Sequence, residues 1–493
     1  SVGGITSSLS SKSKGSITSC YVVGNLTADT SNRKAAGIVT AANGGTIKNC
    51  YYMGTITGAV TYACADDTAV LDDTFYCLNN CGEENANIAV MTQEQFESGY
   101  VAAMLGRAYG QKLGEEKHPV LNDGTNQVFL VNGTPQYGSA AVCQQLIDSI
   151  GTVALDGTAN CFRAVAAAQA CYEMLSAEEQ AKVTNFALLQ EKLAAYDAVA
   201  AAYSAELDAL GEITLESKAA IETARAHYNA YIERGGEKAR ITNLALLASA
   251  EADYALCVTA ENERKIEASM GTRTVDGKEF YEISNAEQLT WFRMLVNGEL
   301  AKKPQNTAAN AVLVADITLN ENLLSTIFDD AGTLLPDKLS EMERWKPIGR
   351  PYEIIYSGTF DGDGHVLSGL YTEAADGNDY TGMFGHVTGT IQNLTLRDTY
   401  SAGREAAPLA YLVEKTGVID HCVAEGNAIA RSYAGGLVNS LNNRAHMRNC
   451  YVMGTVSSKT RAGGLVVSNS GTMENCYVNA QVLNAKQKAL WTQ

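Results

Sequence analysis

Short stretches of alternating apolar and polar residues, separated by glycine and asparagine, make up both ends of the chain. Near the C-terminus, Ala-Gly-Gly-Leu-Val occurs at 434–438 and again at 462–466, and each copy is followed by Asn-Cys-Tyr-Val, at 449–452 and 475–478. Alternation with a period of two predicts short β-strands, and a phrase that returns at roughly thirty-residue intervals indicates a solenoid. Each repeat then forms one coil, which buries its apolar side only against neighbouring coils.

The first residues of the chain carry the same phrases: Val-Gly-Gly-Ile at 2–5, Cys-Tyr-Val-Val-Gly at 20–24, Ala-Gly-Ile-Val at 36–39 and Cys-Tyr-Tyr-Met-Gly at 50–54. Further on, Thr92 and Gln95 have the spacing of a capping box that opens a helix. A helix laid over the last coil would cover its exposed strand edges. We therefore predict that 1–121 contains the final coils and closing cap of a β-solenoid, followed by a linker at 122–139.

The middle of the chain has a different pattern. Glycine becomes rare, alanine and glutamate increase, and apolar residues recur at helical spacing. Val-Thr-Asn-Phe-Ala-Leu-Leu at 183–189 returns as Ile-Thr-Asn-Leu-Ala-Leu-Leu at 241–247. This repeat predicts two three-helix bundles, at 140–200 and 201–266, which would form a stiff spacer if they share a long helix.

The β pattern restarts after the helical region. A strand is predicted from Phe280, and Ser284 with Glu287 has the spacing of a second capping box. Trp291 falls on the apolar stripe of the helix that follows. We predict that 267–493 is the opening cap and coils of a second β-solenoid. The expected fold class is mostly β plus α, with parallel β-helix segments on either side of two tandem three-helix bundles.

These phrases resemble the GLUG-motif β-solenoid modules of large bacterial surface proteins, as in the repeat region that precedes the protease in IgA-peptidase-like proteins. The match covers 1–121 and 275–493, and the helical pair resembles the tandem three-helix spacers of such proteins. The resemblance implies a secreted, multi-module, cell-surface protein, of Gram-positive type. It does not imply the protease, because the sequence contains no His-Glu-x-x-His motif.

The order of the caps differs from that of the family, because the opening cap lies only in the C-terminal β region and the closing cap only in the N-terminal one. If Gln493 were joined to Ser1, the two glycine phrases at the junction would be 33 residues apart, as Gly4 and Gly37 are. We therefore expect one period of an array, or a subunit that stacks head-to-tail on a copy of itself or on an adjacent module. The predicted interface comprises Gly3, Gly4, Ile5, Cys20, Gly464, Leu465, Val466 and Cys476.

Composition narrows the classes of function. The formal net charge is −18, so no excess of Lys or Arg is available to neutralise phosphates, and nucleic-acid binding is not expected. The sequence has no run of about 18 apolar residues, so membrane insertion is not expected either. Both features fit the extracellular, cell-surface location that the resemblance implies.

The cysteines fall into two classes. Those at equivalent positions of successive coils are predicted to form a ladder of buried thiols, because parallel side chains suit disulfide geometry poorly. They are Cys20, Cys50, Cys422, Cys450 and Cys476. Cys64, Cys77 and Cys81 lie in an acidic, loop-like stretch and are the candidates for a disulfide.

The sequence contains few candidate residues for metal binding or catalysis. Asp361 and Asp363 are candidates for a metal site, although Asp and Gly are also the residues that tight turns require. No catalytic or cofactor-binding motif is present, and Arg397, Asp398 and Arg404 come nearest to a cluster of carboxylate and cations. We therefore predict a non-enzymatic structural or adhesive repeat unit without a cofactor. A module that binds surface glycans or host proteins is the first alternative, and a polysaccharide-active β-helix enzyme is the second.

Overall fold

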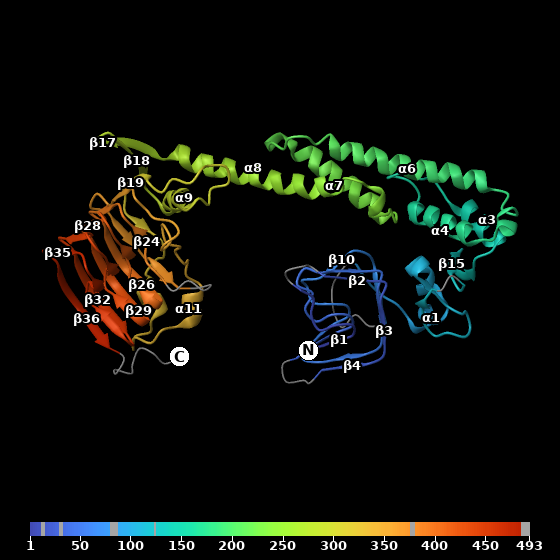
Figure 1. The fold of residues 1–493 in the computed structure, drawn as a ribbon, viewed down its shortest axis with the longest axis horizontal. Helices are drawn as coiled ribbons and strands as arrows, with labels where there is room; N and C mark the ends of the chain where they lie inside the picture. The colour runs from blue at the N-terminus through green and yellow to red at the C-terminus, as the bar shows by residue number, and fades with distance from the viewer. Residues whose placement is uncertain (11–14, 29–32, 79–86, 123–124, 375–379, 485–493) are drawn as a thin grey trace. The chain divides into compact units, whose positions relative to one another are not determined.

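The computed structural model describes residues 1–10, 15–28, 33–78, 87–122, 125–374 and 380–484 (Figure 1). It divides into two compact units. The first comprises Ser1–Glu212 with Glu216–Glu251, and the second comprises Ile213–Leu215 with Ala252–Gln493. Helices and strands are both abundant, and most strands pair in parallel.

The first unit begins with four small parallel sheets. In spatial order, the first sheet contains β1 (Val2–Gly3), β5 (Lys34–Ala36) and β9 (Val60–Tyr62), and the second contains β10 (Val70–Leu71), β6 (Thr46–Lys48) and β2 (Ser16–Thr18). The third contains β12 (Ile88–Val90), β11 (Phe75–Cys77), β7 (Tyr51–Met53) and β3 (Tyr21–Val23). The fourth pairs β4 (Leu26–Thr27) with β8 (Ile56–Thr57). We call the strands contributed by one repeat a rung. Neighbouring rungs pair through equivalent residues, such as Tyr21 with Tyr51, so the parallel pairing predicted from the repeats is confirmed.

Two short helices, α1 (Gln93–Glu97) and α2 (Tyr100–Leu105), follow these sheets. The predicted capping box is confirmed, because Gln95 N–H donates to Thr92 Oγ1 and Thr92 N–H donates to Gln95 Oε1. After η1 (Gly106–Ala108), β13 (Tyr109–Gly110) pairs antiparallel with β14 (Val120–Leu121). The segment buries a cluster comprising Tyr51, Tyr76, Phe96, Val101, Leu105 and Tyr109.

The segment predicted as a linker contains a hairpin of β15 (Val128–Val131) and β16 (Thr134–Tyr137), and its Phe129 is buried in the helical core. The helices are α3 (Ala140–Ser149), α4 (Cys161–Met174), α5 (Ala177–Gln180), α6 (Phe186–Asp208), α7 (Lys218–Glu233) and α8 (Ala245–Ser269), with η2 (Leu215–Ser217) and η3 (Lys238–Arg240) between them. α8 therefore ends three residues beyond the predicted end of the helical region, at 266.

The two copies of the Thr-Asn phrase make the same contact. Asn185 Nδ2 donates to Asp148 Oδ1 at 2.7 Å, and Asn243 Nδ2 donates to Asp208 Oδ1 at 2.6 Å. In each case the amide of a loop asparagine binds an aspartate of an earlier helix, α3 or α6. This equivalence supports the internal repeat predicted from the sequence.

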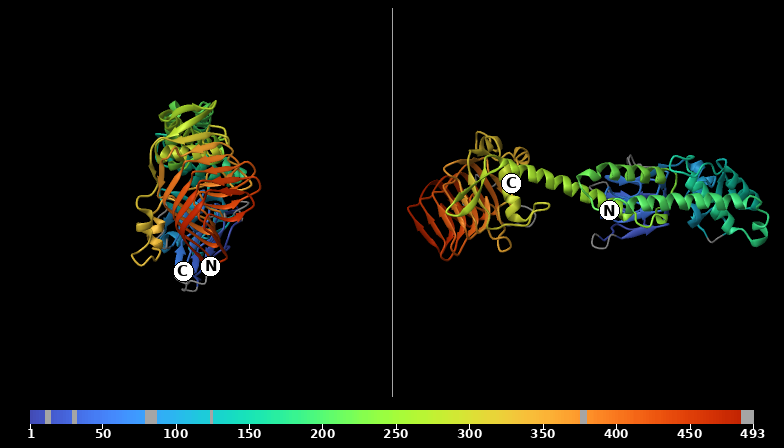
Figure 2. Two further views of the ribbon diagram at one scale, coloured as in Figure 1. Left: turned by 90° about the vertical axis from the view of Figure 1, so that its left-hand side faces the viewer. Right: turned by 90° about the horizontal axis from the view of Figure 1, so that it is seen from above.

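Three larger sheets form the second unit (Figure 2). The first runs β17 (Gly271–Val275), β18 (Lys278–Ile283), β19 (Asn310–Leu313), β21 (Thr359–Asp361), β25 (Thr390–Gln392), β28 (Val418–Asp420), β31 (His446–Arg448) and β35 (Thr472–Glu474). The second runs β20 (Ile317–Thr318), β22 (Val366–Ser368), β26 (Thr395–Ala406), β29 (Val423–Gly435), β32 (Tyr451–Ser458) and β36 (Tyr477–Asn484), with β23 (Tyr371–Glu373) beside β26 and β33 (Arg461–Gly463) beside β29. The third runs β24 (Phe384–Val387), β27 (Ala410–Val413), β30 (Val438–Leu441) and β34 (Val466–Asn469).

All named strand pairs of the second unit are parallel except β17 with β18. In the third sheet, Ala410 pairs with Val438 and Val438 pairs with Val466, so equivalent residues lie 28 positions apart along the chain. Ala410 and Val438 are buried and Val466 is partly buried, and all three pack with the large residues of the first rungs in one continuous core. This burial explains why the apolar phrase recurs with so little change.

The helix at the start of the second unit, α9 (Ala286–Asn297), begins one residue later than predicted. Its N-cap is Asn285 rather than Ser284, because Asn285 Oδ1 accepts a hydrogen bond from Gln288 N–H at 2.9 Å. Asn caps a helix as well as Ser does, so the sequence allows both registers. The observed register buries Gln288 and also Trp291, whose position in the core was predicted.

The glycines of the repeated phrase let neighbouring rungs approach closely. A Cβ atom at Gly436 would lie 2.0 Å from the carbonyl oxygen of Gly464 in the next rung. Likewise, a Cβ at Gly4 would lie 2.0 Å from the Gly37 oxygen. Only glycine fits where one backbone lies directly on another.

We therefore expect Gly436→Ala to lower the free energy of unfolding of the second unit by about 1–3 kcal/mol, the usual cost of forcing extra atoms into a packed interior. Urea unfolding followed by tryptophan fluorescence measures this loss, because Trp291 and Trp345 both lie in this unit. Asn443→Ala, at an exposed turn, is the control and should leave the midpoint unchanged.

Candidate functional site

The turn at one equivalent place in six of the repeats puts a polar residue in the left-handed backbone region. These residues have φ between 49° and 56°, and they are Ser19, Asn49, Asn393, His421, Asn449 and Asn475. Asparagine adopts this conformation more readily than most residues, because its short polar side chain bonds locally. The turn explains why asparagine precedes cysteine in the repeated phrase.

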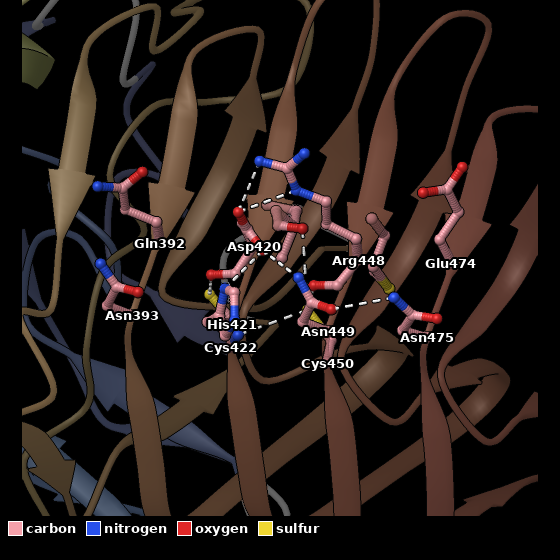
Figure 3. A network of polar contacts seen from close by, with 12 residues as sticks. Gln392, Asn393, Asp420, His421, Cys422, Arg448, Asn449, Cys450, Glu474 and Asn475 are labelled. Atoms are coloured by element: carbon pink, nitrogen blue, oxygen red, sulfur yellow. Dashed lines mark hydrogen bonds and ion pairs between the residues drawn. The ribbon is translucent and has the colours of Figure 1, made fainter.

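The turn side chains form a ladder of hydrogen bonds along the second unit (Figure 3). Asn449 Nδ2 donates to Asp420 Oδ1 at 2.9 Å, and Asn475 Nδ2 donates to Asn449 Oδ1 at 3.3 Å. In the first unit, Asn49 Nδ2 donates to Ser19 Oγ at 3.3 Å. Each amide therefore donates toward the preceding rung, so the ladder has a direction.

Among the carboxylates of this ladder, Asp420 has the most polar partners. Arg448 Nε and Nη2 lie 2.9 and 2.8 Å from its Oδ2, and His421 Nδ1 lies 2.7 Å from its Oδ1. Partial burial raises the pKa of Asp420, but hydrogen bonds from Arg448 and Asn449 outweigh it, so the pKa lies below the ordinary value. The carboxylate is thus kept ionised mainly by Arg448 and Asn449 of the next rung.

We expect Asp420→Asn to destabilise the second unit by on the order of 1 kcal/mol at pH 7, since half-exposed ion pairs contribute little more. The carboxylate pKa is lowered by folding, so its contribution is present above the unfolded-state pKa of about 3.9 and is lost as the pH falls through the folded-state value. Urea unfolding of both proteins between pH 7 and about pH 2 tests this. A difference that stayed constant in acid would contradict it.

The cysteine ladder is confirmed as a row of thiols. Cys20, Cys50, Cys422, Cys450 and Cys476 form no disulfide in the described part of the chain, and the middle three are buried. Neighbouring members are linked through the backbone, because Cys20 N–H lies 3.3 Å from Cys50 Sγ and Cys422 N–H lies 3.4 Å from Cys450 Sγ. Burial raises the pKa of Cys50 to about 11, which keeps this thiol protonated.

The tyrosines that follow these cysteines stack in pairs. The rings of Tyr21 and Tyr51 are 5.0 Å apart and nearly parallel, and those of Tyr451 and Tyr477 are 4.9 Å apart. Tyr51 is fully buried, whereas 57% of Tyr477 is exposed. Tyr477 is exposed because it lies in β36, which pairs only with β32 among the described strands.

The first rung of the first unit (β1 to β4) and the last rung of the second unit (β33 to β36) each have one unpaired side within the described residues. In every paired case, the tyrosine N–H donates to the cysteine carbonyl of the preceding rung, as from Tyr51 to Cys20 and from Tyr477 to Cys450. The first rung therefore presents the donor of this bond, the Tyr21 N–H, and the last rung presents its acceptor, the Cys476 carbonyl.

The residues predicted for the interface all lie on these two rungs. Gly3, Gly4, Ile5 and Cys20 belong to the first rung, and Gly464, Leu465, Val466 and Cys476 belong to the last. The nearest atoms to a Cβ at Gly464 would be the two methyl groups of Val478, at 2.9 Å, whereas a Cβ at Gly436 would lie 2.0 Å from the backbone oxygen of Gly464 as well as 2.8 Å from a methyl group of Val452. The space above Gly464 is therefore the one that a further rung would occupy.

Asp361 and Asp363 form a hydrogen-bonded turn. Asn393 Nδ2 and Gln392 Nε2 donate to the two oxygens of Asp361, at 2.9 and 2.7 Å, and Arg273 Nη2 donates to Asp363 at 2.9 Å. No group of three or more potential metal-ligating side chains is gathered anywhere in the described residues. Each carboxylate thus has a partner within the protein.

Four of the other candidates have a defined place in the fold, and they are Cys64, Cys77, Arg397 and Asp398. Cys64 and Cys77 are both buried in the core of the first unit. Cys64 lies in a bend after β9, whereas Cys77 ends β11 and so does not lie in the predicted loop-like stretch. Cys81 lies outside the described residues, so the disulfide stays a prediction. Asp398 Oδ1 accepts a hydrogen bond from Leu324 N–H at 2.9 Å, and Arg397 pairs with Glu425 at 2.9 Å, so both have structural roles.

A cavity that the sequence did not predict lies in the second unit, between the outer face of β29 and β32 and an insertion at 322–340. The insertion contains α10 (Leu323–Ile327) and α11 (Pro336–Ser340). The only signal in the sequence is apolar spacing of four residues, from Leu323 to Ile327 and from Leu324 to Phe328. A helix of five residues is too short for this spacing to identify it.

Comparisons with known proteins do not assign this chain to a family. No protein-family model matches the chain, and no curated protein matches it. The crystal structure of a protein described as a putative immunoglobulin A1 protease from Bacteroides ovatus is similar over 43% of this chain and 64% of its own, with 24% sequence identity and a TM-score of 0.32. Less than two thirds of that protein is therefore matched. Within the described residues, no helix is both long and apolar enough to cross a lipid bilayer.

Proposed function

We propose that this protein is a non-enzymatic structural or adhesive repeat unit of an extracellular bacterial surface protein or filament. In this proposal both parallel-sheet regions are β-solenoids, and the helices between them are two three-helix bundles. The last rung of one unit stacks on the first rung of the next. That next unit is a second copy of the chain or a further module of the same polypeptide.

The solenoid assignment is supported by the register of the sheets. The three sheets of the second unit take their parallel strands from successive repeats in the same order, and the spacing is 28 residues both from Ala410 to Val438 and from Val438 to Val466. Stacked repeats of this kind contact only their neighbours, so an outer rung leaves its apolar and polar groups without a partner. The proposal therefore hinges on what covers the outer rungs.

The two outer rungs carry complementary groups, and this observation carries the proposal. Stacking them would pair the Tyr21 N–H with the Cys476 carbonyl, which repeats the bond between Tyr51 and Cys20. The Ser19 hydroxyl would continue the donor ladder by reaching the Asn475 amide oxygen, and Tyr477 would stack on Tyr21. Exposed strand edges associate readily when their hydrogen-bonding pattern and side chains match.

Sedimentation velocity of the full chain over a roughly hundredfold range of concentration tests the proposal, because association through open edges depends on mass action. We expect the average mass to rise with concentration, and negative-stain electron microscopy to show end-to-end chains rather than closed dimers. A protein that stayed monomeric throughout this range would contradict the proposed stacking.

A further inference from the structure

A cavity of about 490 Å³ lies beside α10 on the outer face of the second unit. One wall is formed by Leu324 and Phe328 of the insertion, and the floor is formed by Ile429 of β29. Its size falls within the range of about 300–1,000 Å³ that small-molecule sites occupy. It lies apart from the outer strand edges, so an inference about it does not depend on stacking.

The insertion that forms the wall is held in place. Leu323 and Ile327 are fully buried against a cluster that includes Tyr371 and Tyr400 of the sheet, and Phe328 packs edge-on against Tyr400 at 5.6 Å. The loop after α10 is fixed by Asp329 Oδ1, which accepts backbone hydrogen bonds from Ala331 at 3.0 Å and Thr333 at 2.7 Å. A wall anchored in this way keeps its shape when the cavity is empty, which reduces the entropic cost of binding.

Polar groups line the other side of the cavity. Asn427 and Thr455 are paired residues of β29 and β32, so their side chains stand next to each other on one face of the sheet. Neither side chain is hydrogen-bonded to another described residue. The exposed carboxylates of Asp329 and Asp330 lie at the rim, and no basic side chain lines the cavity.

We propose that this cavity binds a neutral saccharide of one or two units. A pyranose ring has an apolar C–H face, which fits against Leu324, Phe328 and Ile429, and a rim of hydroxyl groups. The Asn427 amide offers a donor and an acceptor to such hydroxyls, Thr455 offers a hydroxyl, and the carboxylates offer acceptors. Asp329 and Asp330 repel sugars that carry a carboxylate or sulfate.

The test is isothermal titration calorimetry of the full chain with maltose, lactose and N,N′-diacetylchitobiose in turn. 3′-Sialyllactose is the acidic comparator, and trilysine represents a basic peptide as the alternative occupant. We expect at least one neutral disaccharide to bind, 3′-sialyllactose to bind at least about tenfold more weakly than that disaccharide, and trilysine not to bind. Binding of none of the three neutral disaccharides, or of trilysine alone, would overturn the proposal.

Two substitutions locate the binding to this cavity. Asn427→Ala and Thr455→Val each remove a hydrogen-bonding group from the sheet face, and each should weaken the observed saccharide binding by about tenfold or more, because the hydroxyls they serve are left unpaired. Asn443→Ala, a substitution of the same kind at an exposed turn outside the cavity, should leave the affinity unchanged. Saccharide binding that survives both cavity substitutions intact would place the site elsewhere and overturn the proposal.

Discussion

The full chain carrying Gly464→Ala should sediment as a monomer at concentrations at which the unaltered protein forms end-to-end assemblies. Within the chain, the new methyl group would lie 2.9 Å from the two methyl groups of Val478, so this exposed side chain must shift slightly to admit it. In a stacked pair of units it would meet the carbonyl oxygen of the next rung at about 2 Å, as a methyl group at Gly436 would meet Gly464. We therefore expect association to weaken by at least about tenfold, since a backbone clash separates the two rungs.

Gly436→Ala is the matched comparison for this substitution, because the same change one rung earlier acts inside the folded unit. Gly464→Ala should shift the urea midpoint of the second unit much less than Gly436→Ala does, and only Gly464→Ala should abolish assembly of an otherwise folded protein. Asn443→Ala, at an exposed turn of the preceding rung, should leave both stability and assembly unchanged. If Gly464→Ala assembled as well as the unaltered chain, the outer rung would not be the contact surface.

Phe292→Ala should lower the free energy of unfolding of the second unit by about 3–5 kcal/mol, the usual cost of removing a buried aromatic side chain. Phe292 is fully buried, and its ring lies 6.0 Å from that of Phe360 and 6.3 Å from that of Tyr356. Because α9 covers the first rungs, the void left by the missing ring would lie between this helix and the strands beneath it. Urea unfolding followed by tryptophan fluorescence measures the loss, since the neighbouring Trp291 reports on this region.

The comparison for this variant is Phe292→Leu, which keeps most of the buried volume and should cost less than half as much. Far-ultraviolet circular dichroism before unfolding shows whether each variant reaches the folded state. Equal losses for both substitutions would indicate that ring geometry matters more than the volume buried beneath α9.

The sequence predicted the features that depend on residues close to one another in the chain. The glycine phrase, the turn asparagines and the Thr92 capping box each depend on residues within a few positions of one another, so their spacing is visible in the chain. The buried position of Trp291 also follows from the apolar spacing of a twelve-residue helix. Local patterns of this length constrain structure strongly.

The features that were missed depend on residues one or more rungs away. The partners of Asp361 are Gln392 and Asn393, about thirty residues later, and only the register of the sheet brings them together. Cys77 was assigned to a loop-like stretch, although it ends β11, because a strand of three residues is too short to show alternation. The cavity beside α10 requires an insertion to fold back on the sheet, which no local pattern specifies.

The constant spacing of Ala410, Val438 and Val466 limits how such a chain can change length. Deleting one complete interval of 28 residues rejoins two equivalent points, so each remaining strand still meets a matching neighbour. A deletion of half that length would bring a left-handed turn against a buried position. Viable length variants should therefore differ mainly by whole repeats. Smaller changes are confined to the turns between strands, as in the 26-residue spacing of His446 and Thr472, and to insertions that leave the stack, such as the one containing α10.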